Sequence, residues 1–236
     1  MRLGAVQRFW DDQADADPMW AILTDPAKAG GRWNADEFFA TGTREVGAFM
    51  QRTAAWGAPA SRLSALDFGC GIGRLTQALA VHFEQVYGVD ISPKMIELAN
   101  TYNRHGARCQ YLCNPAGDLS RFADGSIDMI YSWITLQHVR PRYARRYIRE
   151  FLRVLAPGGL LLFQYPSRPI HLRFHLARWT ALLSRPRPMY MNGMDREDVV
   201  ELLEHGGGRV LEVGQDDTAI PGYRSLSYTV TRSVTR

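Results

Sequence analysis

The sequence lacks a long hydrophobic segment. Its unbroken apolar stretches, such as Leu160 to Phe163, are far too short to cross a bilayer. Acidic residues fill the stretch from Asp11 to Asp17, where a signal peptide needs an apolar core. We therefore expect a soluble, cytoplasmic protein without stable membrane insertion.

Cysteine is scarce as well. The three cysteines, Cys70, Cys109 and Cys113, form no paired framework and have no matching histidine pair, so neither a disulfide scaffold nor a metal site is expected. The net charge is +4 and the arginines are spread widely, with one denser zone from Arg168 to Arg196. Because nucleic-acid binders concentrate their charge in a stripe with interleaved aromatics, no nucleic-acid partner is expected.

Strand and helix patterns divide the chain in two. Residues 1–60 have helical periodicity and predict an N-terminal helical cap. From residue 61 short apolar runs alternate with amphipathic helices, which predicts an α/β domain over 61–236 with a doubly wound, mostly parallel sheet. A segment rich in proline and arginine, residues 166–193, predicts a lid insertion. Two strands near the end of the chain predict an antiparallel hairpin at the sheet edge.

A glycine-rich turn follows the first strand. It reads Asp67-Phe68-Gly69-Cys70-Gly71-Ile72-Gly73 and opens a helix. Gly69 and Gly71 allow the backbone to turn tightly and to approach a ligand without a Cβ in the way. Ligands of doubly wound folds bind at the carboxyl ends of the strands, where this turn lies.

An acid stands at the end of the second strand. Asp90 lies 17 residues after Gly73, the last glycine of the turn. At this position of a doubly wound fold, a carboxylate can accept hydrogen bonds from ribose hydroxyls. The glycine spacing is G-x-G-x-G, one residue shorter than a dinucleotide fingerprint, and Asp67 would repel a pyrophosphate but suits an ammonium group. These features favour S-adenosyl-L-methionine over a nicotinamide cofactor.

The chain resembles the class I S-adenosylmethionine-dependent methyltransferase family, in its small-molecule branch. The resemblance covers about residues 60–165 and is carried by LDFGCGIGRLTQALA (66–80), YGVDISPKMIELA (87–99), DGSIDMIYSWITLQHV (124–139) and RVLAPGGLLLFQ (153–164). It implies a Rossmann-like, seven-stranded sheet with one antiparallel strand, and transfer of a methyl group to a small-molecule acceptor.

The resemblance also implies cofactor contacts. The turn would hold the methionine moiety, Asp90 the ribose, and Ile91 and Met95 the adenine, although Met95 is equally suited to a helix core. The loop after the third strand would reach the adenine edge, and Ser132 with Trp133 would lie under the sulfur. The residues expected at the cofactor are Asp67, Gly69, Cys70, Gly71, Gly73, Asp90, Ile91, Met95, Asn114, Asp118, Leu119, Ser132 and Trp133.

His138 is the candidate general base, because it follows the fourth strand and histidine titrates near neutrality. The alternatives are that it orients a loop or touches the cofactor. The residues expected at the acceptor are Gln137, Tyr165, His171, Tyr190 and Tyr223. Trp10 belongs to an N-terminal aromatic set for which ordinary burial is the preferred interpretation for most members, and the alternative is that one or two of them close over the acceptor.

Several interpretations stay open at this point. The stretch from Ile170 to Leu183 is amphipathic and suits a lid, a homodimer contact or a surface helix for an anionic membrane. An RNA or protein methyltransferase, a NAD(P)-dependent oxidoreductase and a non-catalytic S-adenosylmethionine-binding protein are the alternative functions. The acceptor, and whether O, N or C is methylated, do not follow from the sequence.

Overall fold

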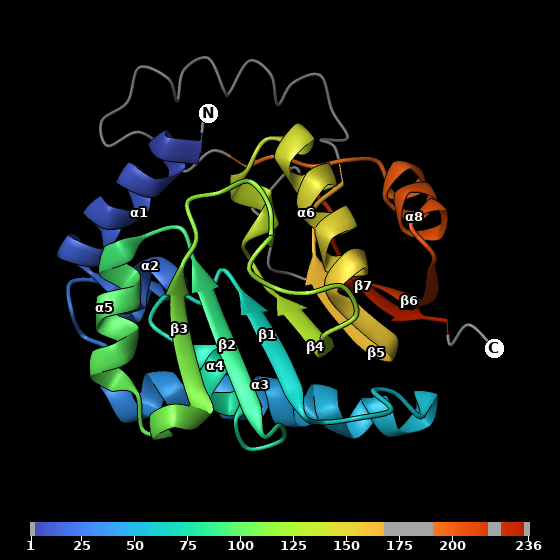
Figure 1. The fold of residues 1–236 in the computed structure, drawn as a ribbon. Coiled ribbons are helices and arrows are strands. Elements are labelled where there is room, and N and C mark those ends of the chain that lie inside the picture. The colour runs from blue at the N-terminus through green and yellow to red at the C-terminus, as the bar shows by residue number, and fades with distance from the viewer. Residues whose placement is uncertain (1–2, 168–190, 217–222, 234–236) are drawn as a thin grey trace, which may run out of the picture.

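A seven-stranded sheet forms the centre of the computed structural model, which describes residues 3–167, 191–216 and 223–233 (Figure 1). The strands are β1 (Ser64–Phe68), β2 (Gln85–Asp90), β3 (Cys109–Cys113), β4 (Ile127–Ser132), β5 (Leu155–Gln164), β6 (Gly208–Asp216) and β7 (Ser225–Arg232). Their order is β3-β2-β1-β4-β5-β7-β6. The first five strands pair in parallel, and β7 runs antiparallel to both β5 and β6. The predicted doubly wound, seven-stranded sheet with one antiparallel strand is confirmed.

Helices lie on both faces of this sheet (Figure 1). The α-helices are α1 (Leu3–Ala16), α2 (Pro18–Ile22), α3 (Ala35–Thr53), α4 (Arg74–Leu79), α5 (Pro93–Tyr102), α6 (Pro141–Val154) and α8 (Arg196–His205). Short 3-10 turns connect them at η1 (Pro26–Lys28), η2 (Ala54–Trp56), η3 (Gly106–Arg108) and η4 (Leu136–His138).

Side chains at the helix starts satisfy the first free backbone N–H groups. The Asn34 Oδ1 atom accepts hydrogen bonds from the N–H groups of Asp36 and Glu37 at 2.9 and 3.2 Å, and α3 begins directly after Asn34. The Ser92 hydroxyl accepts from Met95 N–H at 3.1 Å, with Pro93 in the first turn of α5.

Alternating strand residues build a separate core on each face. Leu66 and Phe68 of β1 pack with the apolar side of α6 and with α8. Ala65 of the same strand faces the opposite core, which contains residues of α3, α4 and α5. Helix α3 is therefore part of the layer that covers the sheet, and the strands are held in register from both sides.

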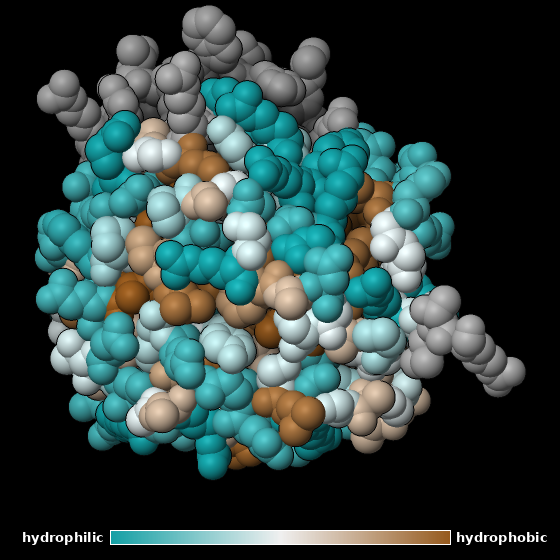
Figure 2. All heavy atoms as spheres, viewed as in Figure 1, coloured by the Kyte–Doolittle hydropathy of each residue, from teal (hydrophilic) through white to brown (hydrophobic). Residues whose placement is uncertain are grey.

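Apolar side chains are mostly inside. Hydrophilic residues dominate the face shown in Figure 2, and hydrophobic ones appear there in small patches. Leu63 and Val81 are the large hydrophobic residues classed as exposed in the described part of the chain. Within the same residues, no helix has the length and apolar character needed to cross a membrane.

Most of the predicted lid insertion, residues 166–193, lies outside the described residues, and so does most of the arginine-rich zone. His171 and Tyr190, predicted at the acceptor, lie outside them as well.

Candidate cofactor and acceptor site

The glycine turn is anchored to the second strand by its own backbone. The N–H groups of Gly69 and Cys70 both donate to the Val89 carbonyl, at 2.7 and 3.0 Å. Gly69 and Gly71 have φ angles of +81° and +52°, a region that residues with a Cβ rarely adopt. A Cβ on Gly69 would lie 2.2 Å from the Thr135 side chain, and one on Gly71 would lie 2.6 Å from Ile22. The turn therefore requires glycine for conformation and for space.

Asp90 links this turn to the next helix. Its Oδ2 atom accepts from Gly71 N–H and its Oδ1 atom from Ser92 N–H, both at 2.9 Å. Burial raises the pKa of the Asp90 carboxyl, and the backbone N–H groups of Ser92, Gly71 and Ile91 act against this by stabilising the anion. Each oxygen has a further lone pair, so the carboxylate can still accept from a ligand.

Asn114 follows the third strand and lies beside Asp90. Its backbone N–H donates to the Asp90 carbonyl at 2.7 Å, and its Nδ2 atom donates to the Asp118 carbonyl at 2.8 Å. The side chain therefore closes the turn that begins the loop over residues 114–126.

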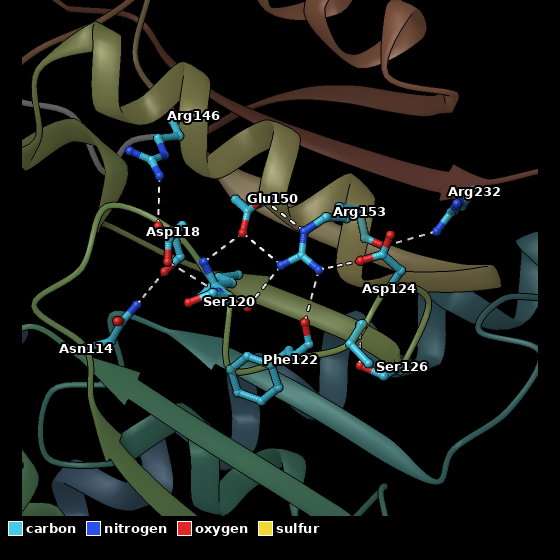
Figure 3. Close-up of polar contacts among 12 residues, drawn as sticks. Asn114, Asp118, Ser120, Phe122, Asp124, Ser126, Arg146, Glu150, Arg153 and Arg232 are labelled. Atoms are coloured by element: carbon cyan, nitrogen blue, oxygen red, sulfur yellow. Dashed lines mark hydrogen bonds and ion pairs between the residues drawn. The ribbon is translucent and has the colours of Figure 1, made fainter.

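Helix α6 fixes the far side of that loop (Figure 3). Glu150 accepts from Leu119 N–H at 2.7 Å and pairs with Arg153, which lowers the pKa of the Glu150 carboxyl. Arg153 also donates to the carbonyls of Leu119 and Phe122 and to Asp124. All of its guanidinium nitrogens are used, so one side chain of α6 sets the position of the whole loop.

The segment after β4 forms the opposite wall. The Ser132 hydroxyl donates to the Phe68 carbonyl at 3.0 Å, which ties the ends of β4 and β1 together. Ile134 has a φ of +55°, although it is β-branched. A β-branched residue in this region has a strained backbone, and such strain occurs most often at functional sites.

The first two helices cover the carboxyl ends of the strands. The Trp10 ring of α1 meets the His138 ring edge to face, with centroids 5.4 Å apart. Ile22 at the end of α2 lies against Gly71. The Ser92 hydroxyl donates to the Asp11 carboxylate at 2.6 Å, and Lys94 forms an ion pair with Asp15, so α1 is attached to α5.

A cavity lies between these elements, at the point where the strand order reverses between β1 and β4. Eight predicted site residues line it, from four different strand ends: Gly69, Gly71, Asp90, Ile91, Met95, Asn114, Trp133 and His138. The structure thus brings together residues that are far apart in the sequence.

Six residues predicted at the cofactor do not line the cavity: Asp67, Cys70, Gly73, Asp118, Leu119 and Ser132. Asp67 is buried behind the turn, where it accepts from the Thr76 hydroxyl at 2.6 Å. Burial raises the pKa of Asp67 to about 7. The Asp118 carboxylate pairs with Arg146 instead (Figure 3).

Two further members of this group have structural partners. A Cβ on Gly73 would lie 2.4 Å from the Tyr111 hydroxyl, beneath the turn, so its close packing is with β3. The Leu119 N–H is already bonded to Glu150 and is not directed to a ligand.

Three of the predicted acceptor residues, Gln137, Tyr165 and Tyr223, lie in the described part of the chain, and none of them lines the cavity. Gln137 is buried next to His138, and Tyr165 is fully buried. The Tyr223 hydroxyl donates to the Met191 carbonyl at 3.1 Å.

The N-terminal helices contribute more residues to the cavity wall than the sequence predicts. Leu3, Val6 and Trp10 of α1 and Ala21 and Ile22 of α2 all line the cavity. The spacing of Leu3, Val6 and Trp10 predicts that one side of α1 is covered by other residues. The same spacing arises whether that side packs against a core or over a cavity. The remaining lining residues are Phe68, Val89, Ile134, Thr135, Val139 and Tyr147.

No cluster of three or more His, Cys, Asp or Glu side chains in the described ranges is arranged to hold a metal ion.

Comparisons with known proteins agree with this architecture. Residues 66–163 match the family model described as "Methyltransferase domain". A ubiquinone biosynthesis O-methyltransferase of Bordetella pertussis is 27% identical over 162 residues, which cover 68% of this chain and 57% of that protein. A 24-methylenesterol C-methyltransferase of Oryza sativa is 30% identical over 169 residues, covering 69% and 45%.

A solved structure has the same fold. The magnesium protoporphyrin IX methyltransferase of Synechocystis, crystallised with bound SAH, superposes with a TM-score of 0.67 at 20% identity, and the match covers 98% of this chain and 99% of that one. The chain spans less than two thirds of the length of the first curated relatives. The family match and the sheet order together identify residues 66–163 as a methyltransferase domain of the class I, S-adenosylmethionine-dependent family.

Proposed function

We propose that the protein transfers a methyl group from S-adenosyl-L-methionine to a small-molecule acceptor. The observation that carries the proposal is the placement of the Asp90 carboxylate 2.9 Å from Gly71 N–H, at the switch point of the sheet. This arrangement combines a ribose-binding acid with a backbone turn that a ligand can approach.

The residues present fit that cofactor. Asp90 would hold the ribose hydroxyls, and Ile91 and Met95 supply apolar surface for an adenine ring. Asn114 supplies polar atoms at the same end of the cavity. Among the described residues that line the proposed site there is no lysine or arginine, which suits a ligand without phosphate.

S-adenosylmethionine, when bound, supplies a methyl carbon activated by its sulfonium charge. The residues of this chain then have to hold an acceptor in line and keep water out. Trp10, Trp133 and Tyr147 surround the remaining space with aromatic surface, and α1 with α2 covers it. We propose that the acceptor is partly apolar and flat enough to lie between these rings.

His138 contributes an imidazole ring to the cavity wall. As a general base, its neutral imidazole would accept a proton from an acceptor hydroxyl or amine through a free nitrogen lone pair. If that lone pair is engaged in another hydrogen bond, His138 would only orient the acceptor. The named relatives include an O- and a C-methyltransferase, so the acceptor atom stays open among O, N and C.

The other parts of the proposal follow from the enclosed site. Of the predicted cap over residues 1–60, α1 and α2 line the cavity, and we propose that they close it. The lid insertion over 166–193 stays a prediction, since most of it lies outside the described residues. An enclosed pocket favours a small acceptor over a nucleic acid. A cytoplasmic location and a possible homodimer remain predictions.

A screen of candidate metabolites tests the proposal. The purified protein is incubated with S-adenosylmethionine and each compound, and demethylated cofactor and methylated product are measured by mass spectrometry. We expect stoichiometric formation of both with a flat, partly apolar acceptor, and loss of both in the Asp90→Ala variant. Binding of the cofactor without product for any acceptor class would favour the non-catalytic alternative.

A further inference from the structure

A chain of buried polar side chains leads from the last strand to His138. The Gln164 Nε2 atom donates to Ser225 Oγ at 2.8 Å and to Gln137 Oε1 at 3.2 Å. The Gln137 Nε2 atom lies 3.2 Å from His138 Nε2. The chain therefore joins β7, β5 and η4 and ends at a ring that lines the cavity.

This chain is buried throughout. Gln164 is 0% exposed, and Gln137 and Ser225 are each 2% exposed. Burying an amide among apolar side chains is costly unless its hydrogen bonds are made. The Gln137 carbonyl also accepts two bonds from Asn192, through its N–H at 2.7 Å and its Nδ2 atom at 3.2 Å. The backbone that carries Gln137 and His138 is thus fixed from a second side.

The direction of the hydrogen bonds follows from the placement of the Gln164 amide nitrogen, which faces both Ser225 and Gln137. An amide nitrogen donates and does not accept, so both partners of Gln164 Nε2 must be acceptors. Gln137 must then present its oxygen to Gln164 and its nitrogen to His138. A nitrogen donor at His138 Nε2 requires a lone pair there, which places the ring proton on Nδ1.

We infer that Gln164 is a positioning residue, which acts through Gln137 to hold His138 as the neutral Nδ1–H tautomer with its Nε2 lone pair engaged. In this state His138 orients the acceptor and does not deprotonate it. The tautomer itself does not depend on the proposed methyl transfer, whereas this consequence for the mechanism rests on it.

The Gln164→Glu variant changes the direction of the chain while keeping the shape of the side chain. A carboxylate cannot donate to Gln137 Oε1, so Gln137 turns its nitrogen toward residue 164 and its oxygen toward His138. The ring must then carry its proton on Nε2. The Gln164→Met variant keeps the volume and removes both donors, so the ring is no longer restricted to one tautomer.

Nuclear magnetic resonance of protein with ¹⁵N-labelled histidine tests this directly. Long-range ¹H–¹⁵N spectra distinguish the two tautomers, and the His138→Asn variant assigns the signal among the six histidines. We expect Nδ1–H in the wild type, Nε2–H in Gln164→Glu and a mixture in Gln164→Met. Gln85→Met is the matched control, since Gln85 donates to Arg108 far from the cavity, and it leaves the His138 signal unchanged.

The inference is overturned if the wild type shows Nε2–H, or if a folded Gln164→Met keeps the wild-type tautomer. With an acceptor in hand, Gln164→Met should lower kcat by about tenfold with little change in cofactor affinity, as expected for a misplaced contact group. A wild type without turnover but with the expected tautomer would reject the proposed function and leave the inference intact.

Discussion

Replacing Asp90 with asparagine tests the cofactor site with the smallest change in shape. The carboxylate now accepts from the N–H groups of Gly71 and Ser92, both at 2.9 Å, and would accept from the ribose as well. Asparagine has one acceptor oxygen and adds an NH₂ group, so at least one of these bonds is lost and two donors face each other. A hydrogen bond to a charged group contributes about 1.5–3 kcal/mol, which corresponds to a loss of about 10- to 150-fold in affinity.

Isothermal titration with S-adenosylhomocysteine measures this loss. The Asp12→Asn variant is the control, because Asp12 lies on the exposed side of α1 and its substitution changes the net charge equally. Thermal unfolding of both variants checks that they are folded. A folded Asp90→Asn protein that binds with wild-type affinity would refute the assignment of Asp90 to the ribose.

Three other perturbations follow from the structure. Asp67 has a pKa of about 7 when folded, against 3.8 when exposed, so between these values the folded protein keeps a proton that the unfolded chain has lost. The free energy of unfolding of the wild type then falls as the pH rises from 4 to 8, and the stability of Asp67→Asn relative to the wild type should rise by up to ~4 kcal/mol over that range. The same difference in unfolding free energy between the two proteins at pH 4 and pH 8, measured by denaturant titration, would contradict this. Arg153→Lys should lower the free energy of unfolding by about 2 kcal/mol, because a single ammonium cannot replace the hydrogen bonds to the 114–126 loop. Arg149→Lys, on the exposed side of α6, is the control and should change the stability little. Equal urea midpoints for the two variants would refute the role of Arg153 in holding the loop. Trp10→Ala should raise the KM for the acceptor by up to about tenfold through loss of an aromatic contact. Trp20 does not line the cavity, so Trp20→Ala should leave this KM unchanged. An unchanged KM in Trp10→Ala would show that α1 is not part of the acceptor site.

The fold could be predicted because its signals are local. Short apolar runs separated by amphipathic helices fix the number and direction of the parallel strands. The neighbourhood of Gly71 and Asp90 follows from the same rule, since the carboxyl ends of parallel strands meet at one edge of a sheet. For this reason the sequence alone predicts that two residues 19 positions apart belong to one site.

The contacts that refine the site are not local. The Leu119 N–H is bonded to Glu150, 31 residues later, and no pattern in the loop itself indicates this partner. Gln137 meets Gln164 only because β5 ends beside η4. The φ of +55° at Ile134 contradicts the preference of its own residue type, so tertiary contacts decide it.

The role of Trp10 shows a different limit. An apolar side on a helix predicts burial, but the same pattern arises whether the helix covers a packed core or a ligand cavity. In this protein α1 covers a cavity, where Trp10 lies against His138 and Val6 is a further lining residue.

The proposed function requires the turn at 69–73 and Asp90 to bind an adenosyl ligand. Titration of the wild-type protein with S-adenosylhomocysteine tests it most directly, in competition with NAD and ATP at equal concentrations. We predict saturable binding of one equivalent with a Kd of about 1 to 100 µM, and none of the competitors displacing it. No heat of binding up to millimolar ligand, or displacement by NAD, would contradict the account.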